Sequence, residues 1–67
     1  MIEITLNGAP HRVPAPSTLA QLLDSLALTG KRLAVERNGE IVPRGLHAKT
    51  SLEAGDRLEI VVAVGGG

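Results

Sequence analysis

The last three residues of the chain are the ones whose type and spacing most clearly suggest chemistry. Gly65, Gly66 and Gly67 directly follow the strand-like run IVVAV at 60–64. Glycine loses more conformational freedom on ordering than any other residue, so neither packing nor regular secondary structure accounts for three in succession. Together they provide a narrow main chain that ends in an unobstructed carboxylate at Gly67. The alternative is a frayed end or a cloning remnant, and the glycines alone do not decide between the two.

A carboxylate at Gly67 would need activation before it could react. It is an anion at neutral pH, because the pKa of an α-carboxyl group is about 3.3–3.7. Adenylation by ATP would convert it into a mixed anhydride whose carbon accepts a sulfur nucleophile. The chain has no Gly-rich loop leading into a helix, so a partner would have to hold the ATP. Residues 63–67, extended at about 3.3 Å each, would reach roughly 17 Å into that partner.

No other residues have the spacing of a conventional active site. His11 and His47 are far apart and neither belongs to a metal-binding H-x-x-x-H or H-E-x-x-H pattern. Asp24, Glu36 and Glu53 form no paired-carboxylate arrangement, and no serine or threonine has a recognisable base partner. We therefore expect no catalytic residues and no bound metal or cofactor.

Length and composition narrow the class of protein. Sixty-seven residues make one small domain, and the absence of cysteine excludes disulfides and thiolate metal sites. Seven basic and seven acidic residues cancel and are scattered, and there is no aromatic residue, which argues against a nucleic-acid partner. No export signal is visible, and no apolar run approaches the ~20 residues that span a bilayer. We expect a cytoplasmic protein that has no membrane partner.

The first fourteen residues predict a β-hairpin. Apolar and polar residues alternate over 2–6, and Asn7-Gly8 is the pair that a two-residue turn prefers. This turn places Ile2 opposite Val13. Pro10 cannot donate a hydrogen bond to the ladder, so the second strand is expected at an edge of the sheet.

A helix is expected to follow. Thr18 and Gln21 have the spacing of a capping box at its start. An apolar stripe at helical spacing is formed by Leu19, Leu22, Leu23 and Leu26. Gly30 is expected to end the helix or the turn after it, and Lys31 and Arg32 would favour the negative end of the helix dipole.

A second hairpin is centred on Asn38-Gly39. This turn places Val35 opposite Val42 and Arg37 opposite Glu40. The pattern leaves open which face is buried, because Ala34 and Ile41 share the other side. Pro43 again indicates an edge.

The remaining segments complete the fold. Residues 45–51 are expected to form a crossing loop with a helical turn around Leu46 and His47, and Leu52 to close the core. Leu58, Ile60 and Val62 alternate in the most apolar strand, which we expect at the centre of the sheet, parallel to the first strand. The order hairpin, helix, hairpin, loop, strand predicts an α+β, ubiquitin-like β-grasp: a mixed sheet of four to five strands packed against one helix. The domain would span 1–62, and 63–67 would be an extended, flexible tail.

Over essentially its full length the chain resembles the ThiS family, the sulfur carrier proteins of thiamine biosynthesis. The likeness rests on IEITLNG at 2–8, VERNGEIVPR at 35–44, AGD at 54–56 and VGGG at 64–67. The ending is the most specific of these segments, and the central one is second.

The resemblance implies a protein co-substrate and not an enzyme. A ubiquitin-activating-like adenylyltransferase would use ATP to form an acyl adenylate on Gly67. Sulfur from cysteine, delivered by a cysteine desulfurase, would convert it to a thiocarboxylate, and thiazole synthase would consume that sulfur. Gly66 and Gly65 match the glycines that precede the modified one, and Val61 and Val64 would contact partners near the base of the tail.

Three alternatives belong to other classes of protein. The small subunit of molybdopterin synthase is also a β-grasp sulfur carrier, but it is usually longer and has an aromatic, proline-rich approach to its glycines. A carrier for tRNA thiolation or a ubiquitin-like protein modifier would share the same ending. A plain binding module would have a tail without a role. Arg37 and Arg44 either steer an acidic partner or are ordinary solvated charges.

Overall fold

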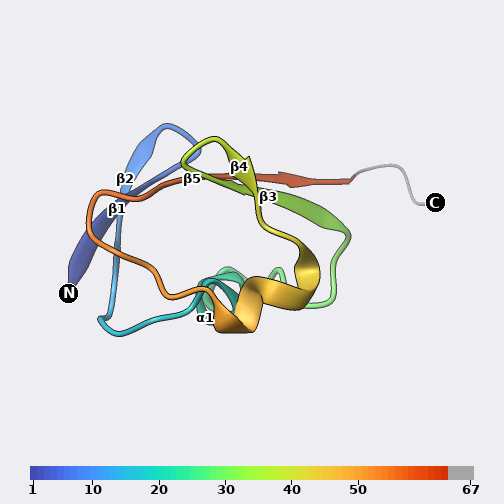
Figure 1. The fold of residues 1–67 in the computed structure, drawn as a ribbon, viewed down its shortest axis with the longest axis horizontal. Coiled ribbons are helices and arrows are strands. Elements are labelled where there is room, and N and C mark those ends of the chain that lie inside the picture. Colours follow the sequence, from blue (N-terminus) through green and yellow to red (C-terminus); the bar gives the residue numbers. More distant parts are fainter. Residues whose placement is uncertain (64–67) are drawn as a thin grey trace.

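The computed structural model describes residues 1–63, and residues 64–67 lie outside the described part. In chain order the elements are β1 (Ile2–Leu6), β2 (Ala9–Val13), α1 (Leu19–Ser25), β3 (Leu33–Arg37), β4 (Glu40–Ile41), the 3-10 helix η1 (Arg44–Lys49) and β5 (Arg57–Val62). The sheet has the strand order β2-β1-β5-β3-β4, and α1 and η1 lie on one of its faces (Figure 1). The predicted β-grasp architecture is confirmed.

Both hairpins have the predicted register. Ile2 pairs with Val13 in the first hairpin, and Arg37 pairs with Glu40 in the second. The two asparagines of the turns, Asn7 and Asn38, have φ values of 49° and 52°. Asparagine tolerates this left-handed region better than most residues, which is why each Asn-Gly pair makes so compact a turn. The two outer strands, β2 and β4, lie at the edges as their prolines predict.

β5 is the central strand of the sheet. It runs parallel to β1, with Leu6 opposite Leu58, and antiparallel to β3, with Val35 opposite Ile60. The parallel pair requires a long connection, which α1 and the second hairpin provide. The strand that leads to the final glycines is therefore flanked by a hydrogen-bonded neighbour on each side.

The core is aliphatic and lies between the sheet and α1. Its least exposed large side chains are Ile4, Leu19, Val35 and Leu58. Burial of each such side chain contributes roughly 1.5–3 kcal/mol relative to exposure. Leu52, at 5% exposure, closes the core as predicted. Val35 is buried whereas Ile41 is 63% exposed. The face of the second hairpin that carries Val35 is therefore the one that packs against the core.

The start of α1 is the predicted capping box. The Thr18 hydroxyl accepts from the Gln21 N–H at 3.2 Å, and the Thr18 N–H donates to Gln21 Oε1 at 2.8 Å. These two bonds satisfy N–H groups that have no partner within the helix. The helix start is also tied to the segment that follows η1, since the Leu19 N–H donates to the Thr50 carbonyl at 2.9 Å.

The end of α1 uses Ala27 in place of a glycine. Ala27 has a φ of 59° and donates its N–H to the Asp24 carbonyl at 3.0 Å. The Leu28 N–H donates to the Leu23 carbonyl at 2.9 Å. These two bonds form a Schellman motif, and partly buried Leu28 packs against the core that contains Leu23.

Gly30 occupies the second of its two predicted places. It has a φ of 83° and lies in the turn closed by the Lys31 N–H and the Leu28 carbonyl, well beyond Ser25, the last helical residue. No basic residue lies in the last turn of α1. The prediction that Lys31 and Arg32 favour the negative end of the helix dipole is therefore wrong, because the helix ends one turn too early.

Replacing Ala27 with glycine is expected to stabilise the fold. Ala27→Gly should raise the free energy of unfolding by about 0.5–1 kcal/mol, because glycine adopts a positive φ without a Cβ clash. Urea unfolding followed by far-UV circular dichroism measures this, since the chain has no aromatic residue for fluorescence. Ala20→Gly, inside α1, should lower the same quantity by about 1 kcal/mol. Equal effects at the two positions would contradict the cap assignment.

The segment after the second hairpin is a 3-10 helix where the sequence predicts a loop with one helical turn. His47 is buried in it, and its Nε2 lies 3.0 Å from the Val42 carbonyl, whereas Leu46 is 48% exposed. No helix within residues 1–63 is long and apolar enough to cross a membrane.

Candidate functional site

The base of the predicted tail is fixed to the start of β3. Val62 pairs with Leu33, and the Ala63 N–H donates to the Arg32 carbonyl at 2.9 Å. Strand-like pairing therefore continues to the last described residue. Most of the predicted tail, 63–67, lies outside the described residues, as do Val64, Gly65, Gly66 and Gly67. Their roles in partner binding and modification stay predictions.

Val61 is the one predicted docking residue that the structure describes. Val61 is 66% exposed, and because it alternates with buried Ile60 along β5 it lies on the face of the sheet away from the core. The helices α1 and η1 cover the other face (Figure 1). Val61 lies opposite Ala34 of β3, and these two residues line a shallow hollow together with Arg32, Leu33 and Ala63. The position of Val61 leaves it accessible to a partner that approaches the base of the tail, and its docking role stays a prediction.

Both turn asparagines hold β5 through their side chains. The Ile60 N–H donates to Asn7 Oδ1 at 2.8 Å, and Asn7 Nδ2 donates to the Ile60 carbonyl at 3.2 Å. The Arg57 N–H donates to Asn38 Oδ1 at 2.9 Å. The carboxamide of Asn7 thus continues the pairing of β1 with β5 beyond the end of β1. Sequence patterns select asparagine at these positions for its backbone conformation and do not show this second use.

The contribution of Asn7 can be measured with a variant that keeps its backbone conformation. Asn7→Gly retains a residue that accepts a positive φ and removes only the carboxamide. The free energy of unfolding is expected to fall by about 1–2 kcal/mol, because two main-chain groups of Ile60 lose their partner. Amide hydrogen exchange should accelerate at Ile60 more than at Ala63, whose N–H bonds to the Arg32 carbonyl just before β3. Uniform acceleration at both amides would show that Asn7 holds no local contact.

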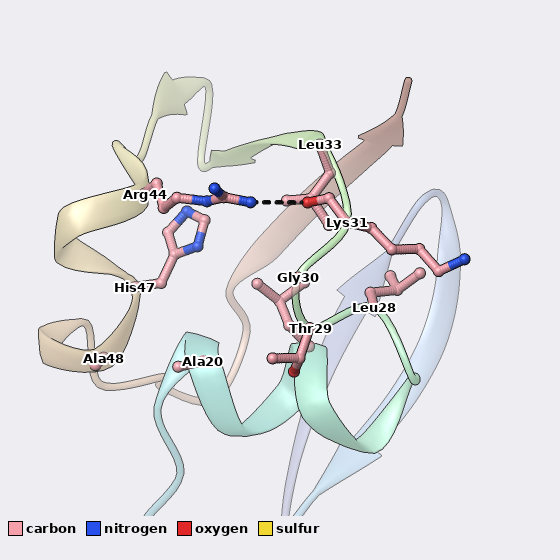
Figure 2. Close-up of a pocket in the computed structure, with 10 residues that line it drawn as sticks. Ala20, Leu28, Thr29, Gly30, Lys31, Leu33, Arg44, His47 and Ala48 are labelled. Atoms are coloured by element: carbon pink, nitrogen blue, oxygen red, sulfur yellow. Dashed lines mark hydrogen bonds between the residues drawn. The ribbon is translucent and has the colours of Figure 1, made fainter. Parts of the chain in front are cut away.

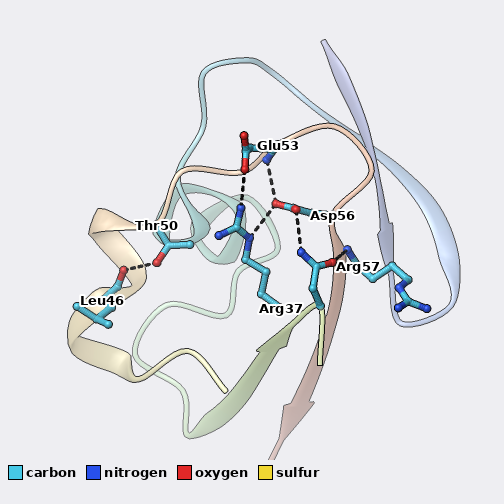
Figure 3. A network of polar contacts seen from close by, with 7 residues as sticks. Arg37, Leu46, Thr50, Glu53, Asp56 and Arg57 are labelled. Atoms are coloured by element: carbon cyan, nitrogen blue, oxygen red, sulfur yellow. Dashed lines mark hydrogen bonds and ion pairs between the residues drawn. The ribbon is translucent and has the colours of Figure 1, made fainter. Parts of the chain in front are cut away.

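Arg37 belongs to an internal polar network at the opposite end of β5 (Figure 3). Its Nε lies 2.9 Å from Asp56 Oδ2, and its Nη2 lies 3.2 Å from Glu53 Oε2. Asp56 is 5% exposed and also accepts from the Glu53 N–H and from Asn38 Nδ2. Arg37 is therefore neither a solvated charge nor a steering charge. No sequence pattern indicates this pairing, because the partners of Arg37 lie 16 and 19 residues away.

The same network sets the ionisation of Asp56. Burial by itself raises the pKa of this carboxyl group. Hydrogen bonds from the Glu53 N–H, the Asn38 amide and Arg37, with the positive charge of Arg37, outweigh burial and hold the pKa below its ordinary value. Asp56 is therefore a carboxylate at neutral pH and anchors the loop that leads into β5.

A hollow of about 260 Å³ lies between α1, η1 and the loop before β3 (Figure 2). Leu23, Leu28 and Leu33 supply apolar lining, and Arg44 and buried His47 line the η1 side. Arg44 reaches across with its guanidinium, and its Nη2 donates to the Lys31 carbonyl at 3.0 Å. The Lys31 ammonium extends away from Arg44 (Figure 2).

The two histidines do not meet. His11 is in β2, an edge strand of the sheet, whereas His47 is in η1, which follows the strand at the other edge, β4. Among residues 1–63 no group of three His, Asp or Glu side chains could hold a metal ion. The described part of the chain thus shows a folded body with a polar network, a hollow and an exposed tail base.

Comparison with known proteins gives matches over nearly the whole chain. The model of the ThiS family matches residues 4–67. The crystal structure of a thiamine biosynthesis protein (ThiS) from Geobacter metallireducens superimposes with a TM-score of 0.81 at 30% identity, covering 98% of this chain and 100% of that one. An uncharacterized protein, ycf40, of Pyropia yezoensis is 39% identical over 98% of this chain and 93% of its own length.

Two further relatives are much longer. A thiazole synthase of Paramagnetospirillum magneticum is 39% identical over 98% of this chain, and one of Magnetococcus marinus is 41% identical over the same share. The chain spans only 20% of the length of each of these two proteins. Each therefore contains a segment similar to this chain within a larger polypeptide.

Proposed function

This chain belongs to the ThiS family, and we propose that it is a sulfur carrier of thiamine biosynthesis whose Gly67 carboxyl group bears the sulfur. The observation that carries the proposal is the family match that runs through the final glycines, to residue 67. The body supports it, since its fold matches that of a thiamine biosynthesis protein (ThiS) over 98% of this chain with a TM-score of 0.81. In this proposal the chain is a co-substrate, and its partners are the catalysts.

The chemistry takes place at one carbon atom. A Gly67 carboxylate oxygen attacks the α-phosphorus of ATP, and pyrophosphate leaves, giving an acyl adenylate. The terminal sulfur of a persulfide then attacks the acyl carbon, and AMP leaves. A thiol cleaves the resulting S–S bond, taking one sulfur into a new disulfide and releasing the thiocarboxylate. The ATP is held by the adenylyltransferase, and the persulfide comes from a cysteine desulfurase.

The chain's own part is to present this carbon. Gly65 and Gly66 add no side chains beside it, so a narrow channel can admit the main chain. β5 supplies a firm base, because Ala63 is hydrogen-bonded to Arg32, just before β3, and Ile60 is hydrogen-bonded to Asn7. Val61, exposed beside this base, and Val64 are the residues we expect to contact the partners.

The longer relatives favour thiazole synthase as the acceptor of the sulfur. In two proteins of that name a segment like this chain makes up 20% of the polypeptide. Joining two proteins in one chain raises their effective concentration, which is useful when they act on each other. We infer that the present chain meets a thiazole synthase as a separate partner.

Intact mass spectrometry tests the proposal. The chain is incubated with ATP, a ubiquitin-activating-like adenylyltransferase and a persulfide source, and replacement of one oxygen by sulfur at Gly67 is expected. An unchanged mass, in conditions that modify an established ThiS protein, would sink the proposal. Transfer of the sulfur to thiazole synthase, and not to a molybdopterin synthase or a tRNA-thiolating enzyme, would separate thiamine biosynthesis from the other two pathways.

A further inference from the structure

Three cationic residues gather where β5 ends. Arg32 is the neighbour of Ala63 across the sheet, since the Ala63 N–H donates to its carbonyl at 2.9 Å. Lys31 precedes it, and Arg44 reaches the same segment from η1, with Nη2 3.0 Å from the Lys31 carbonyl. Although 13 residues separate Lys31 from Arg44 in the sequence, the fold brings the Arg44 guanidinium to the main chain of Lys31, whose ammonium extends away from it (Figure 2). We call Lys31, Arg32 and Arg44 the basic collar.

The collar has no counter-charge in the described structure. Both ion pairs found within residues 1–63 use Arg37, and neither includes a collar residue. All three collar residues are exposed. A guanidinium has five N–H donors. Arg44 uses one of them in its hydrogen bond to the Lys31 carbonyl, which orients the guanidinium and leaves other N–H groups for a carboxylate.

Apolar hollows lie on both sides of the collar. Lys31 and Arg44 line the hollow of about 260 Å³ beside α1, together with three leucines (Figure 2). Arg32 lines the shallow hollow on the outer face of the sheet, with Val61 and Ala63. Charged groups beside apolar contact areas are the usual composition of a protein–protein interface. The absence of aromatic residues and the zero net charge favour a protein over a nucleic acid as the occupant.

We propose that the basic collar binds acidic side chains of the adenylyltransferase around the entrance through which Gly67 reaches ATP. This inference rests on the proposed function and adds the chemistry of the partner's surface. Complementary charge at the rim of an interface acts mainly on the rate of encounter and on orientation. The collar therefore lowers the KM for the carrier and leaves the chemical step at Gly67 unchanged.

The test is steady-state adenylation by an adenylyltransferase that modifies the wild-type chain, measured as pyrophosphate release. Arg32→Glu should raise the KM for the carrier about three- to tenfold, and Arg32→Glu with Arg44→Glu about ten- to thirtyfold, with kcat unchanged. At 0.5 M salt the differences should largely disappear, because the Debye length falls to about 4 Å. Arg12→Glu is the matched control: it makes the same charge change in β2, opposite Glu3, away from the tail.

Arg32→Glu keeps the test clear of folding effects, because no side-chain hydrogen bond or ion pair of Arg32 is found within residues 1–63. A KM for the double variant equal to that of Arg12→Glu, or a lower kcat at unchanged KM, would overturn the collar while leaving the sulfur-carrier function intact. If no such enzyme modifies the wild-type chain, both the function and the collar are overturned.

Discussion

Deletion of Gly66 and Gly67 is expected to abolish thiocarboxylate formation, by more than about a hundredfold, while leaving the body folded. Without them no terminal glycine carboxylate remains at the distance from β5 that the partner's active site requires, and misplaced reacting groups lose most of their rate. The melting temperature should stay within the error of the wild-type value, because among the described residues the core and the side chains packed against it extend no further than Val62. Mass spectrometry after incubation with ATP, adenylyltransferase and a persulfide source measures the loss.

Gly67→Ala is the graded control for the deletion. It keeps the length and the carboxylate and adds one methyl group, so a reduction of roughly tenfold is expected if the channel is narrow. Full activity of the deletion variant in a cellular thiamine assay would contradict the carrier role. It would favour the alternative in which the β-grasp body is a plain binding module.

Asp56→Ala is expected to have the largest effect on stability, about 3 kcal/mol. It leaves Arg37 Nε, the Asn38 amide and the Glu53 N–H without their acceptor in a site that is 5% exposed. A core of this size yields only ~3–5 kcal/mol in total, so much of the variant should be unfolded at 37 °C. Glu53→Ala, which removes the 77% exposed partner of Arg37, should cost less than about 0.5 kcal/mol.

The pH dependence of Asp56→Asn isolates the charge of this group. A carboxyl group whose pKa is lowered by folding adds stability that is present above its unfolded pKa, about 3.9, and is lost as the pH falls through the folded pKa. The gap in unfolding free energy between wild type and Asp56→Asn should therefore be constant above pH 5 and shrink below pH 4 (both approximate). A gap that widened on acidification would show that the pKa of Asp56 is raised.

The local parts of the fold could be predicted because their determinants are adjacent in the sequence. Asn7-Gly8 and Asn38-Gly39 fix a two-residue turn, and turn length sets the register of every pair in the hairpin. The capping box at Thr18 is equally local. The end of α1 was not predictable in the same way, since Ala27 takes a conformation that glycine usually supplies.

Contacts between distant segments could not be read from the pattern. Arg37 meets Asp56, and Arg44 meets Lys31, only after the sheet and η1 have formed. The place of Lys31 and Arg32 at the base of the tail follows from their position just before β3. Because β3 pairs with the end of β5, the residues that precede β3 must lie beside the residues that follow β5. For Gly67 itself the chemistry of its carboxylate could be inferred from residue type, whereas its partners came from family likeness alone.

The central place of β5 also determines how the molecule bears a mechanical load. A partner that draws in the chain beyond Ala63 pulls along β5, parallel to β1 and antiparallel to β3. Force along a central strand acts in shear, so the hydrogen bonds that join the strand to its neighbours bear the load at the same time. They include the two that the Asn7 side chain makes with Ile60. An edge strand such as β4 could be peeled away one bond at a time. The strand order thus lets traction on the terminus be transmitted to the whole body without unravelling it.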